Sequence, residues 1–473
     1  MGWRKKIKKT ELAIVGGGPA GLSAATQAAR LGVSSIIIDE NPYLGGQIFR
    51  RVPADFKIID EEKLGKQYLQ GKEILNEAAE FSERIQVWTG SLVWGYFNDR
   101  QLAVTHEGHL KLLKADQIIL APGAYDRPVP FPGWTLPGVF TAGGAKVMVR
   151  SQGVLPGTRF LLAGSGPLQL ALANDLLKSR AKLVAVVEAA SMTGLWRQVP
   201  RLLRKPDLMW DGFKYLTALK LHDVPFIQSH IIVSAMGSEE VERVVIARAN
   251  NDWQRITGTE RTFDVDAVCL GYGLVPSTDL TRLCGCAHRY DPKLGGWISV
   301  YDEDMQTTVP GIFVAGDGCG VGGVKVAFEQ GKLAATYAAR NLGLVDEVIA
   351  DRLAMPIRNR LKKIWSFQSA ISEVYHVRSG IYALSSEDTT ICRCEEISLR
   401  AIQNAIRAGA SDIDDIKRRT RARMGYCQGR MCAPVILGIA ERDFGLKPED
   451  IGYGRARSPV KPVPMSLLLE TSL

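Results

Sequence analysis

Residues 12–40 carry a pattern that few folds other than a dinucleotide-binding domain produce. A short apolar strand leads into Gly16-x-Gly18-x-x-Gly21, an alanine-rich helix and a second strand that ends at Asp39. The first glycine allows a tight turn, the second lets the backbone approach a pyrophosphate, and the third allows helix to pack on strand. Asp39 follows where a carboxylate accepts hydrogen bonds from ribose hydroxyls. The residues expected to contact the dinucleotide here are Gly16, Gly18, Pro19, Ala20, Gly21, Asp39 and Glu40.

Two later strands that end in glycine turns indicate which dinucleotide is bound. The stretches "ADQIILAPGAYDRPVPFPG" (115–133) and "TTVPGIFVAGDGCG" (307–320) resemble those of two-dinucleotide-domain flavoproteins. The resemblance implies FAD, with Asp317 on its ribityl and pyrophosphate part. The glycine-rich segment after Asp317 and the 3.6-residue apolar period that follows predict a helix beginning near Val324, and in similar flavoproteins such a helix points its N-terminus at the flavin. The turn Gly45-Gly46-Gln47 resembles the flavin-contacting turn of amine-oxidising flavoproteins, although a plain strand-to-helix turn explains it as well. The further residues expected at FAD are Gly46, Gln47, Ala121, Gly123, Gly316 and Asp317.

A second strand, glycine turn, helix and strand occupies residues 158–190. Gly164 and Gly166 match the pattern, Gln169 replaces the third glycine, and Glu188 ends the second strand. Three interpretations stay open. The domain binds NAD(H) with Glu188 on the ribose, serves as a docking platform without redox work, or holds another adenine nucleotide as a structural element. Gly164, Gly166 and Glu188 are the candidate contacts if a nucleotide binds.

The order of these segments predicts an α/β fold with two Rossmann-like domains, the second inserted in the first, as in glutathione and thioredoxin reductases. We expect an FAD domain over 1–150 and 276–345, a second domain over 151–275, and a helical linker over 346–385. Disulfide reductases of this architecture keep a cysteine pair beside the flavin. Residues 41–50 contain none, and the second domain has only Cys269, so a thiol relay to a disulfide substrate is not expected.

Four of the eight cysteines are concentrated near the C-terminus. "ICRCEEIS" holds Cys392 and Cys394, and after 32 intervening residues "GYCQGRMC" holds Cys427 and Cys432. Disulfides are disfavoured in a reduced compartment, and zinc usually takes pairs spaced by two or more residues. A [2Fe-2S] cluster takes four thiolates. The spacing resembles the bacterioferritin-associated-ferredoxin-like (BFD-like) [2Fe-2S] domain, although that domain commonly has C-x-x-C as its second pair.

This resemblance implies a small helical [2Fe-2S] domain over 386–455, with a tail over 456–473. Its metal ligands would be Cys392, Cys394, Cys427 and Cys432. The basic run "KRRTRAR" (417–423) precedes the second pair and would offset the negative charge of the cluster, or it forms an ordinary solvated helix face. Flavin chemistry transfers two electrons and a cluster one, so the chain is expected to be an electron relay.

Charge and hydropathy exclude other classes of protein. No 18-residue apolar run is present, so no integral membrane segment is expected. The net charge of +9 is modest for 473 residues, and we expect no nucleic-acid partner. The N-terminal basic and apolar residues imitate a signal peptide, but Glu11 interrupts them and the glycine turn follows. We expect a cytoplasmic protein, with any attachment to a membrane made through a partner.

The whole of residues 11–455 resembles the alpha subunit of heteromeric, dye-linked amino-acid dehydrogenases. This family includes proline and hydroxyproline dehydrogenases, opine oxidases and hydrogen cyanide synthase. The most specific matches are "PFPGWTLPGV" (130–139), "GYGLVPST" (271–278), "CRCEEI" and "RMGYCQGRMC". Some members hold ATP where others hold FAD, so the resemblance implies FAD at the first site, with ATP as the alternative.

The resemblance also implies a division of labour between subunits. A flavoprotein beta subunit of the glycine and sarcosine oxidase type oxidises proline, hydroxyproline, an opine or glycine. Electrons would pass through an interface flavin, often FMN, to the FAD and cluster of this chain, and on to a quinone or other carrier. A small ferredoxin-like subunit is a further partner that the resemblance allows.

Two other functions compete with this one. A self-contained NADH-dependent reductase would use Glu188 to bind NADH. Gln169 argues against this function, because it replaces the third glycine of the nucleotide-binding turn. A zinc-bearing assembly scaffold would need the four cysteines to hold zinc.

Overall fold

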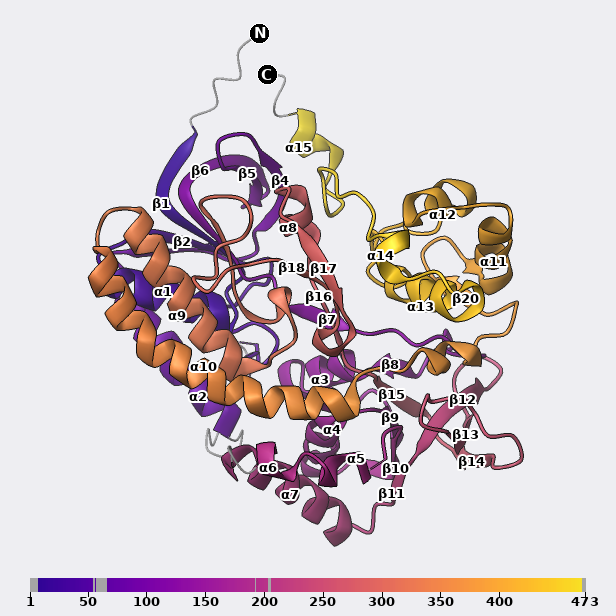
Figure 1. Ribbon diagram of the computed structural model, residues 1–473. Coiled ribbons are helices and arrows are strands. Elements are labelled where there is room, and N and C mark those ends of the chain that lie inside the picture. Colours follow the sequence, from indigo (N-terminus) through magenta and orange to yellow (C-terminus); the bar gives the residue numbers. More distant parts are fainter. Residues whose placement is uncertain (1–6, 54–55, 57–65, 192, 203–205, 470–473) are drawn as a thin grey trace.

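The computed structural model describes residues 7–53, 56, 66–191, 193–202 and 206–469 (Figure 1). Two α/β units lie one above the other, and a small C-terminal domain lies to their side. The two-domain α/β architecture with a helical C-terminal domain is as predicted. Within the described residues, no helix combines the length and the apolar character that crossing a bilayer requires.

The first sheet has a parallel core in the order β3-β2-β1-β6-β19. Residues 109–114 of the long strand β6 pair antiparallel with β5, and its last three residues pair with β19. Both faces are buried in β2 and in the last four residues of β1, which explains the apolar runs there. The strands are β1 (Lys8–Val15), β2 (Ser35–Ile38), β3 (Ile85–Trp88), β4 (Leu92–Phe97), β5 (Gln101–His106), β6 (His109–Leu120) and β19 (Ile312–Val314).

Helices α1 and α9 pack closely against each other beside this sheet. Small residues permit the approach, because a Cβ on Gly331 would lie 2.1 Å from the carbonyl oxygen of Ala20. Helix α9 begins at Val324, as predicted, and α10 crosses both α/β units (Figure 1). The helices are α1 (Pro19–Arg30), α2 (Lys66–Ala79), α9 (Val324–Asn341) and α10 (Glu347–Tyr375).

The second sheet is parallel, in the order β11-β10-β9-β15-β8, with a three-stranded antiparallel sheet beside it. Strand β8 and helix α3 belong to this unit, so the second sheet starts before the predicted boundary at residue 151. The boundary lies earlier because β8 pairs parallel with β15 and forms the edge strand of the second sheet. The strands are β8 (Val139–Thr141), β9 (Arg159–Gly164), β10 (Lys182–Glu188), β11 (Phe226–Gln228), β12 (His230–Met236), β13 (Arg243–Arg248), β14 (Arg261–Asp264) and β15 (Ala267–Gly271); the helices are α3 (Ala142–Ser151), α4 (Pro167–Lys178), α5 (Thr193–Trp196), α6 (Val199–Leu202) and α7 (Pro206–Leu221).

The chain passes between the two units through paired strands β7 and β16. A helix and a hairpin follow the return crossing and face the C-terminal domain (Figure 1). These elements are β7 (Ala124–Asp126), β16 (Leu274–Pro276), α8 (Asp279–Leu283), β17 (His288–Asp291), η2 (Pro292–Leu294), β18 (Gly296–Ser299) and η3 (Gly316–Cys319).

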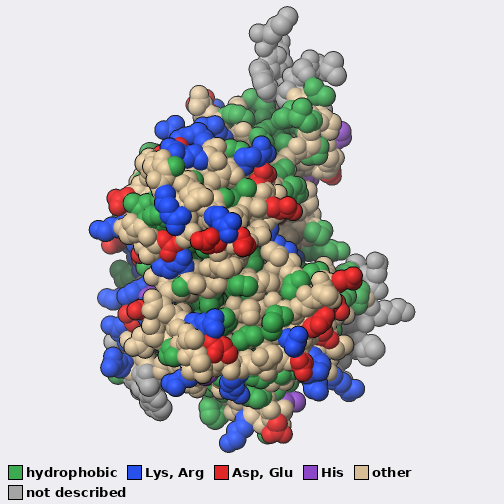
Figure 2. All heavy atoms as spheres, turned by 90° about the vertical axis from the view of Figure 1, so that its right-hand side faces the viewer, with side chains coloured by type: hydrophobic (Ala, Val, Ile, Leu, Met, Phe, Trp, Pro, Cys, Tyr) green, Lys and Arg blue, Asp and Glu red, His purple; other side chains and the backbone are tan. Residues whose placement is uncertain are grey.

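The C-terminal domain packs short helices around a two-stranded hairpin, and the tail then returns to the first sheet. There the backbone N–H of Val460 donates to the Trp94 carbonyl at 2.9 Å. On the face that carries this domain, acidic and basic side chains are interspersed (Figure 2). The elements are η4 (Ser379–Leu384), β20 (Thr390–Cys392), β21 (Ile397–Ser398), α11 (Leu399–Arg407), α12 (Ile413–Thr420), α13 (Ala433–Phe444), α14 (Pro448–Ile451) and α15 (Met465–Leu469).

Candidate functional site

The first glycine turn accepts no larger residue at two of its positions. Gly16 has a φ of +106°, and a Cβ there would lie 2.1 Å from the Ala121 carbonyl oxygen. A Cβ on Gly21 would lie 1.8 Å from the Gly16 carbonyl oxygen. Gly18 caps α1 without a side-chain hydrogen bond, and Pro19 starts the helix. The N–H groups of the first turn are therefore left for a ligand at the positive end of the helix dipole.

Asp39 lies at the carboxyl end of β2 and is buried. Its carboxylate accepts from the backbone N–H of Gly17 at 2.6 Å and of Asn41 at 2.8 Å. These bonds hold the acid beside the glycine turn, as ribose recognition requires. Glu40 instead turns outward and forms an ion pair with Lys461.

The turn at residues 45–47 packs directly on the glycine turn. The Gly45 N–H donates to the Gly17 carbonyl at 2.8 Å, and a Cβ on Gly46 would lie 2.8 Å from Gly18 Cα. Gln47 is exposed, and its side-chain oxygen accepts two hydrogen bonds from the Arg50 guanidinium. The turn thus forms the outer wall of the site.

The third and fourth sides of the site come from the ends of β6 and β19. Gly123 has a φ of +70°, and Gly316 lies against helix α1, where its added Cβ would be 3.0 Å from Ala20 Cβ. Asp317 accepts from the N–H groups of Gly322 and Gly323 at 3.0 and 2.8 Å, just before α9. No side chain caps α9 either. Two uncapped helix N-termini therefore converge on one sheet edge, which fits a dinucleotide with a charged pyrophosphate.

The second glycine turn also holds its acid by backbone N–H groups, and it adds a bond from the residue in the third glycine position. Glu188 is buried and accepts from the N–H groups of Gly166 at 3.0 Å and Ala190 at 2.9 Å. Gln169 donates its amide to the same carboxylate at 2.7 Å. Burial raises the pKa of Glu188 to about 7 in spite of these bonds. Gln169, which replaces the third glycine, thus engages the carboxylate that would bind a ribose.

The end of helix α10 covers this second turn. A Cβ on Gly166 would meet Tyr375 Cβ at 3.5 Å and Cγ at 3.6 Å, while Gly164 lies against Gly271. Tyr375 therefore lies over Gly166, which precedes the α4 N-terminus. No local sequence signal links Tyr375 to this turn, because more than 200 residues separate them.

The four C-terminal cysteines meet in two pairs. Cys392 lies beside Cys432, and Cys394 lies beside Cys427. Among the described residues, no three His, Cys, Asp or Glu side chains converge as a preformed single-ion cage. Two thiol pairs fit a [2Fe-2S] cluster, which takes two protein ligands on each iron. Cys392 and Cys432 are buried, whereas Cys394 is exposed.

Backbone N–H groups lie beside two of these sulfurs, those of Cys392 and Cys427, as they do around iron–sulfur clusters. The Cys432 thiol and the N–H groups of Arg423, Glu395 and Cys394 lower the pKa of Cys392 to about 6. Arg423 is buried, and its Nε has no hydrogen-bond partner among the described residues. That Nε faces the cysteine loop, 3.0 Å from where a Gly429 Cβ would lie. A buried unpaired donor beside the cysteines fits an anionic cluster.

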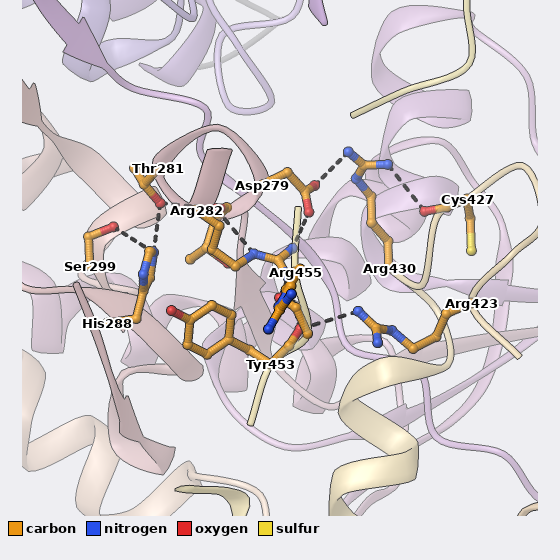
Figure 3. Close-up of polar contacts among 12 residues, drawn as sticks. Asp279, Thr281, Arg282, His288, Ser299, Arg423, Cys427, Arg430, Tyr453 and Arg455 are labelled. Atoms are coloured by element: carbon orange, nitrogen blue, oxygen red, sulfur yellow. Dashed lines mark hydrogen bonds and ion pairs between the residues drawn. The ribbon is translucent and has the colours of Figure 1, made fainter. Parts of the chain in front are cut away.

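Among the basic residues of the run 417–423, only Arg423 is buried. The exposed arginines Arg418, Arg419 and Arg421 fit the solvated helix face, and Arg423 is the basic residue of the run that is placed to offset the charge of a cluster. Arg430, outside the run, links the cluster loop to the first α/β unit. It donates to the Asp279 carboxylate at 2.6 Å and to the Cys427 carbonyl at 3.1 Å (Figure 3).

Comparison with known proteins agrees with this geometry. Residues 10–339 match the family model described as pyridine nucleotide-disulphide oxidoreductase, and residues 390–442 match the BFD-like [2Fe-2S] binding domain. An opine oxidase subunit from Rhizobium meliloti is 32% identical, over 97% of this chain and 87% of that protein. The hydrogen cyanide synthase subunit HcnB of Pseudomonas protegens is 32% identical, over 96% of each chain. The L-proline dehydrogenase structure from P. horikoshii superimposes with a TM-score of 0.70 at 21% identity, over 98% of this chain and 81% of that chain.

The first match spans more than half of the chain and the second covers the four cysteines. The cofactors that these domains accommodate are FAD and a [2Fe-2S] cluster. The chain therefore belongs to the pyridine nucleotide-disulphide oxidoreductase family, as an FAD-dependent oxidoreductase with a C-terminal BFD-like [2Fe-2S] domain.

Proposed function

We propose that this chain is the electron-transferring subunit of a multi-subunit amino-acid or secondary-amine dehydrogenase, with the amine oxidised in a partner flavoprotein. The observation that carries the proposal is the closed second glycine turn. Gln169 engages Glu188, and Tyr375 lies over Gly166. A turn covered in this way favours an electron donor other than NADH.

The relatives supply the class of donor. The opine oxidase and hydrogen cyanide synthase relatives are both named as subunits, and the match to each extends over nearly the whole of this chain. Their names point to oxidation of small amino compounds by an assembly. A partner of the glycine or sarcosine oxidase type, with an interface flavin such as FMN, would complete the enzyme.

We assign the FAD to the edge formed by the first glycine turn, Asp39 and Asp317. The α1 N-terminus would hold the pyrophosphate, Asp39 the ribose, and Asp317 the ribityl chain. When bound, a flavin exchanges electron pairs with a donor and a [2Fe-2S] cluster exchanges single electrons. The protein's part is to orient FAD against the α9 N-terminus, where the helix dipole stabilises negative charge.

We assign the cluster ligands to Cys392, Cys394, Cys427 and Cys432. The exposed side of this site carries Cys394, next to the exposed side chains of Tyr426 and Met424. An external acceptor can approach the cluster from this side without displacing the core, since Cys392 and Cys432 lie inward. The Arg430–Asp279 bridge holds the cluster domain on the FAD domain.

Anaerobic titration of the purified chain tests the proposal. Flavin and cluster absorption should persist with NADH, bleach with dithionite, and bleach with an amino acid only after the partner flavoprotein is added. Bleaching by NADH alone would instead establish a self-contained reductase and contradict the closed turn.

A cysteine variant separates the two cofactors. Cys394→Ser should lose the iron and acceptor reduction while FAD stays bound. The matched control is Cys286→Ser, since Cys286 donates to Thr307 Oγ1 at 3.3 Å and a hydroxyl can do the same. Unchanged iron in Cys394→Ser would refute the ligand assignment, and zinc in place of iron would refute the redox role.

A further inference from the structure

A basic pocket of about 180 Å³ lies where the FAD domain, the cluster domain and the C-terminal tail meet. Helix α8 contributes Asp279 and Arg282, the cluster domain contributes Lys417, Arg423 and Gln428, and residues 455–460 of the tail form the remaining wall. Figure 3 shows Arg282, Arg423 and Arg455 gathered around the backbone at Tyr453. The pocket adjoins the cysteine loop, because Gln428 directly follows Cys427 and Arg423 packs against Gly429. Its lining includes no residue of the first glycine turn.

The charges that line this pocket are strongly unbalanced. Five cationic side chains face one carboxylate, and that carboxylate, Asp279, is already engaged by Arg282 and Arg430. The lining cations are Arg282, Lys417, Arg423, Arg455 and Arg457. Asp414, behind the pocket, accepts from Arg423 at 3.2 Å and from the backbone N–H of Arg455 at 3.0 Å. It therefore offsets only part of the positive charge.

Two of the arginines are held in place before any ligand arrives. Arg282 and Arg423 donate to the same carbonyl oxygen, that of Tyr453, at 2.8 and 3.2 Å (Figure 3). The Arg282 guanidinium also lies over the Tyr453 ring, 5.6 Å from its centroid. Their orientation is set by the protein, which reduces the entropy lost when they bind an anion.

The other three cations that line the pocket are not held by hydrogen bonds of this kind. The side chains of Lys417, Arg455 and Arg457 make no hydrogen bond or ion pair within the described part of the chain. Burial and the neighbouring charge of Arg423 lower the pKa of Lys417, and Arg457 adds to this effect while Asp414 opposes it. Mutual repulsion of this kind is relieved when an anion enters.

We propose that this basic pocket binds a phosphate-class anion, either free phosphate or the phosphate group of a nucleotide. Arginine forks match the paired oxygens of such an anion, and the lysine adds a point charge. Because the cations come from the FAD domain, the cluster domain and the tail, the bound anion would also fasten the tail across the junction.

Calorimetric titration of the purified full-length chain, cofactors retained, tests the proposal in phosphate-free buffer. Inorganic phosphate should bind saturably, more tightly than chloride, and more weakly as salt is raised. Lys417→Ala and Arg455→Ala should each weaken binding on the order of tenfold, as expected for loss of one charged hydrogen bond. The control is Lys447→Ala, an exposed lysine of the same domain outside the pocket.

Two further measurements sharpen the test. Phosphate should slow tryptic cleavage after Arg455 and Arg457, because both side chains become engaged. AMP, compared with adenosine and with inorganic phosphate, tells whether a free or a nucleotide phosphate is preferred, and either preference supports the proposal. Absence of saturable binding would overturn it, as would equal affinity in Lys417→Ala, Arg455→Ala and the wild type.

Discussion

Replacing Glu188 by glutamine is expected to stabilise the second α/β unit at neutral pH while changing little at acid pH. The protonated acid and the amide have nearly the same shape, and each replaces one acceptor oxygen of the carboxylate by a donor group, the O–H of the acid or the NH₂ of the amide. The carboxylate accepts from three donors, the N–H groups of Gly166 and Ala190 and the Gln169 amide. The protonated acid and the glutamine amide each give up at least one of these bonds. Gln169 Oε1 has no hydrogen-bond partner among the described residues. If the Gln169 amide flips, this oxygen can accept from the O–H of the protonated acid or from the NH₂ of the glutamine.

The magnitude follows from the pKa of Glu188. A pKa of about 7 in the fold, against an ordinary value of 4.5, corresponds to about 3 kcal/mol, at about 1.4 kcal/mol for each tenfold change in proton affinity. The folded state binds the proton more tightly, so wild-type stability falls as pH rises from 4.5 to 7 and is level above that. Glutamine does not ionise. The variant's advantage should therefore grow from about 0.8 kcal/mol at pH 5 to about 3 kcal/mol at pH 8.

Hydrogen exchange of the β10 amides is the appropriate assay, because it reports the opening free energy of this sheet apart from the rest of a multidomain chain. Wild type and variant are compared at each pH, so that intrinsic exchange rates cancel. Glu239→Gln, an exposed glutamate of the same unit, is the control. A difference that does not depend on pH, or lower protection of Glu188→Gln at pH 8, would refute the buried-carboxylate argument.

Three other substitutions test the cofactor sites and the domain junction. Gly425→Ala would place a Cβ 2.2 Å from Cys394 Cβ; about 2 kcal/mol of strain should weaken retention of the cluster roughly 30-fold, measured as iron per chain. Gly21→Ala would place a Cβ 1.8 Å from the Gly16 carbonyl oxygen, and a similar or larger penalty should lower the FAD content. Asp279→Asn removes the negative charge that Arg282 and Arg430 share. The contact between the cluster domain and the FAD domain should lose about 2 kcal/mol, so the segment between α10 and β20 should be cleaved by a protease roughly 30-fold faster.

Matched controls distinguish these effects from general damage. Gly212→Ala adds a Cβ with no heavy atom within 4 Å and should leave iron and FAD content unchanged. Asp264→Asn neutralises an exposed carboxylate of β14 and should not change the rate of proteolysis. Full iron in Gly425→Ala, full FAD in Gly21→Ala, or a stable junction in Asp279→Asn would contradict the corresponding assignment.

The glycine turns and the cysteines were accessible to sequence reasoning because each depends on local geometry. Gly16 needs a positive φ, and Gly21 needs close contact within the same βαβ unit. Both requirements select glycine, so they produce a recognisable sequence pattern within about 30 residues. The start of α9 at Val324 was predicted for the same reason. The spacing of the cysteines was informative because the hairpin and the α13 N-terminus that hold them are short local structures.

Other features depend on residues that are far apart in the chain. Gln169 looked like a weakened glycine pattern, and only the fold shows that its amide engages Glu188. Strand β8 joins the second sheet through β15, more than a hundred residues later, so the boundary at residue 151 could not be placed from local composition. The basic run gave no sign that Arg423 alone would be buried.

By itself, the sequence determined which elements form and which cofactor chemistry they accommodate. Glycine conformations, strand burial and cysteine spacing are properties of short segments, and they do not depend on how distant parts of the chain pack. Tertiary structure alone decided whether each site is open. Tyr375 lies over Gly166, and five cations from three segments surround one pocket, because packing brings together residues that have no relation along the chain.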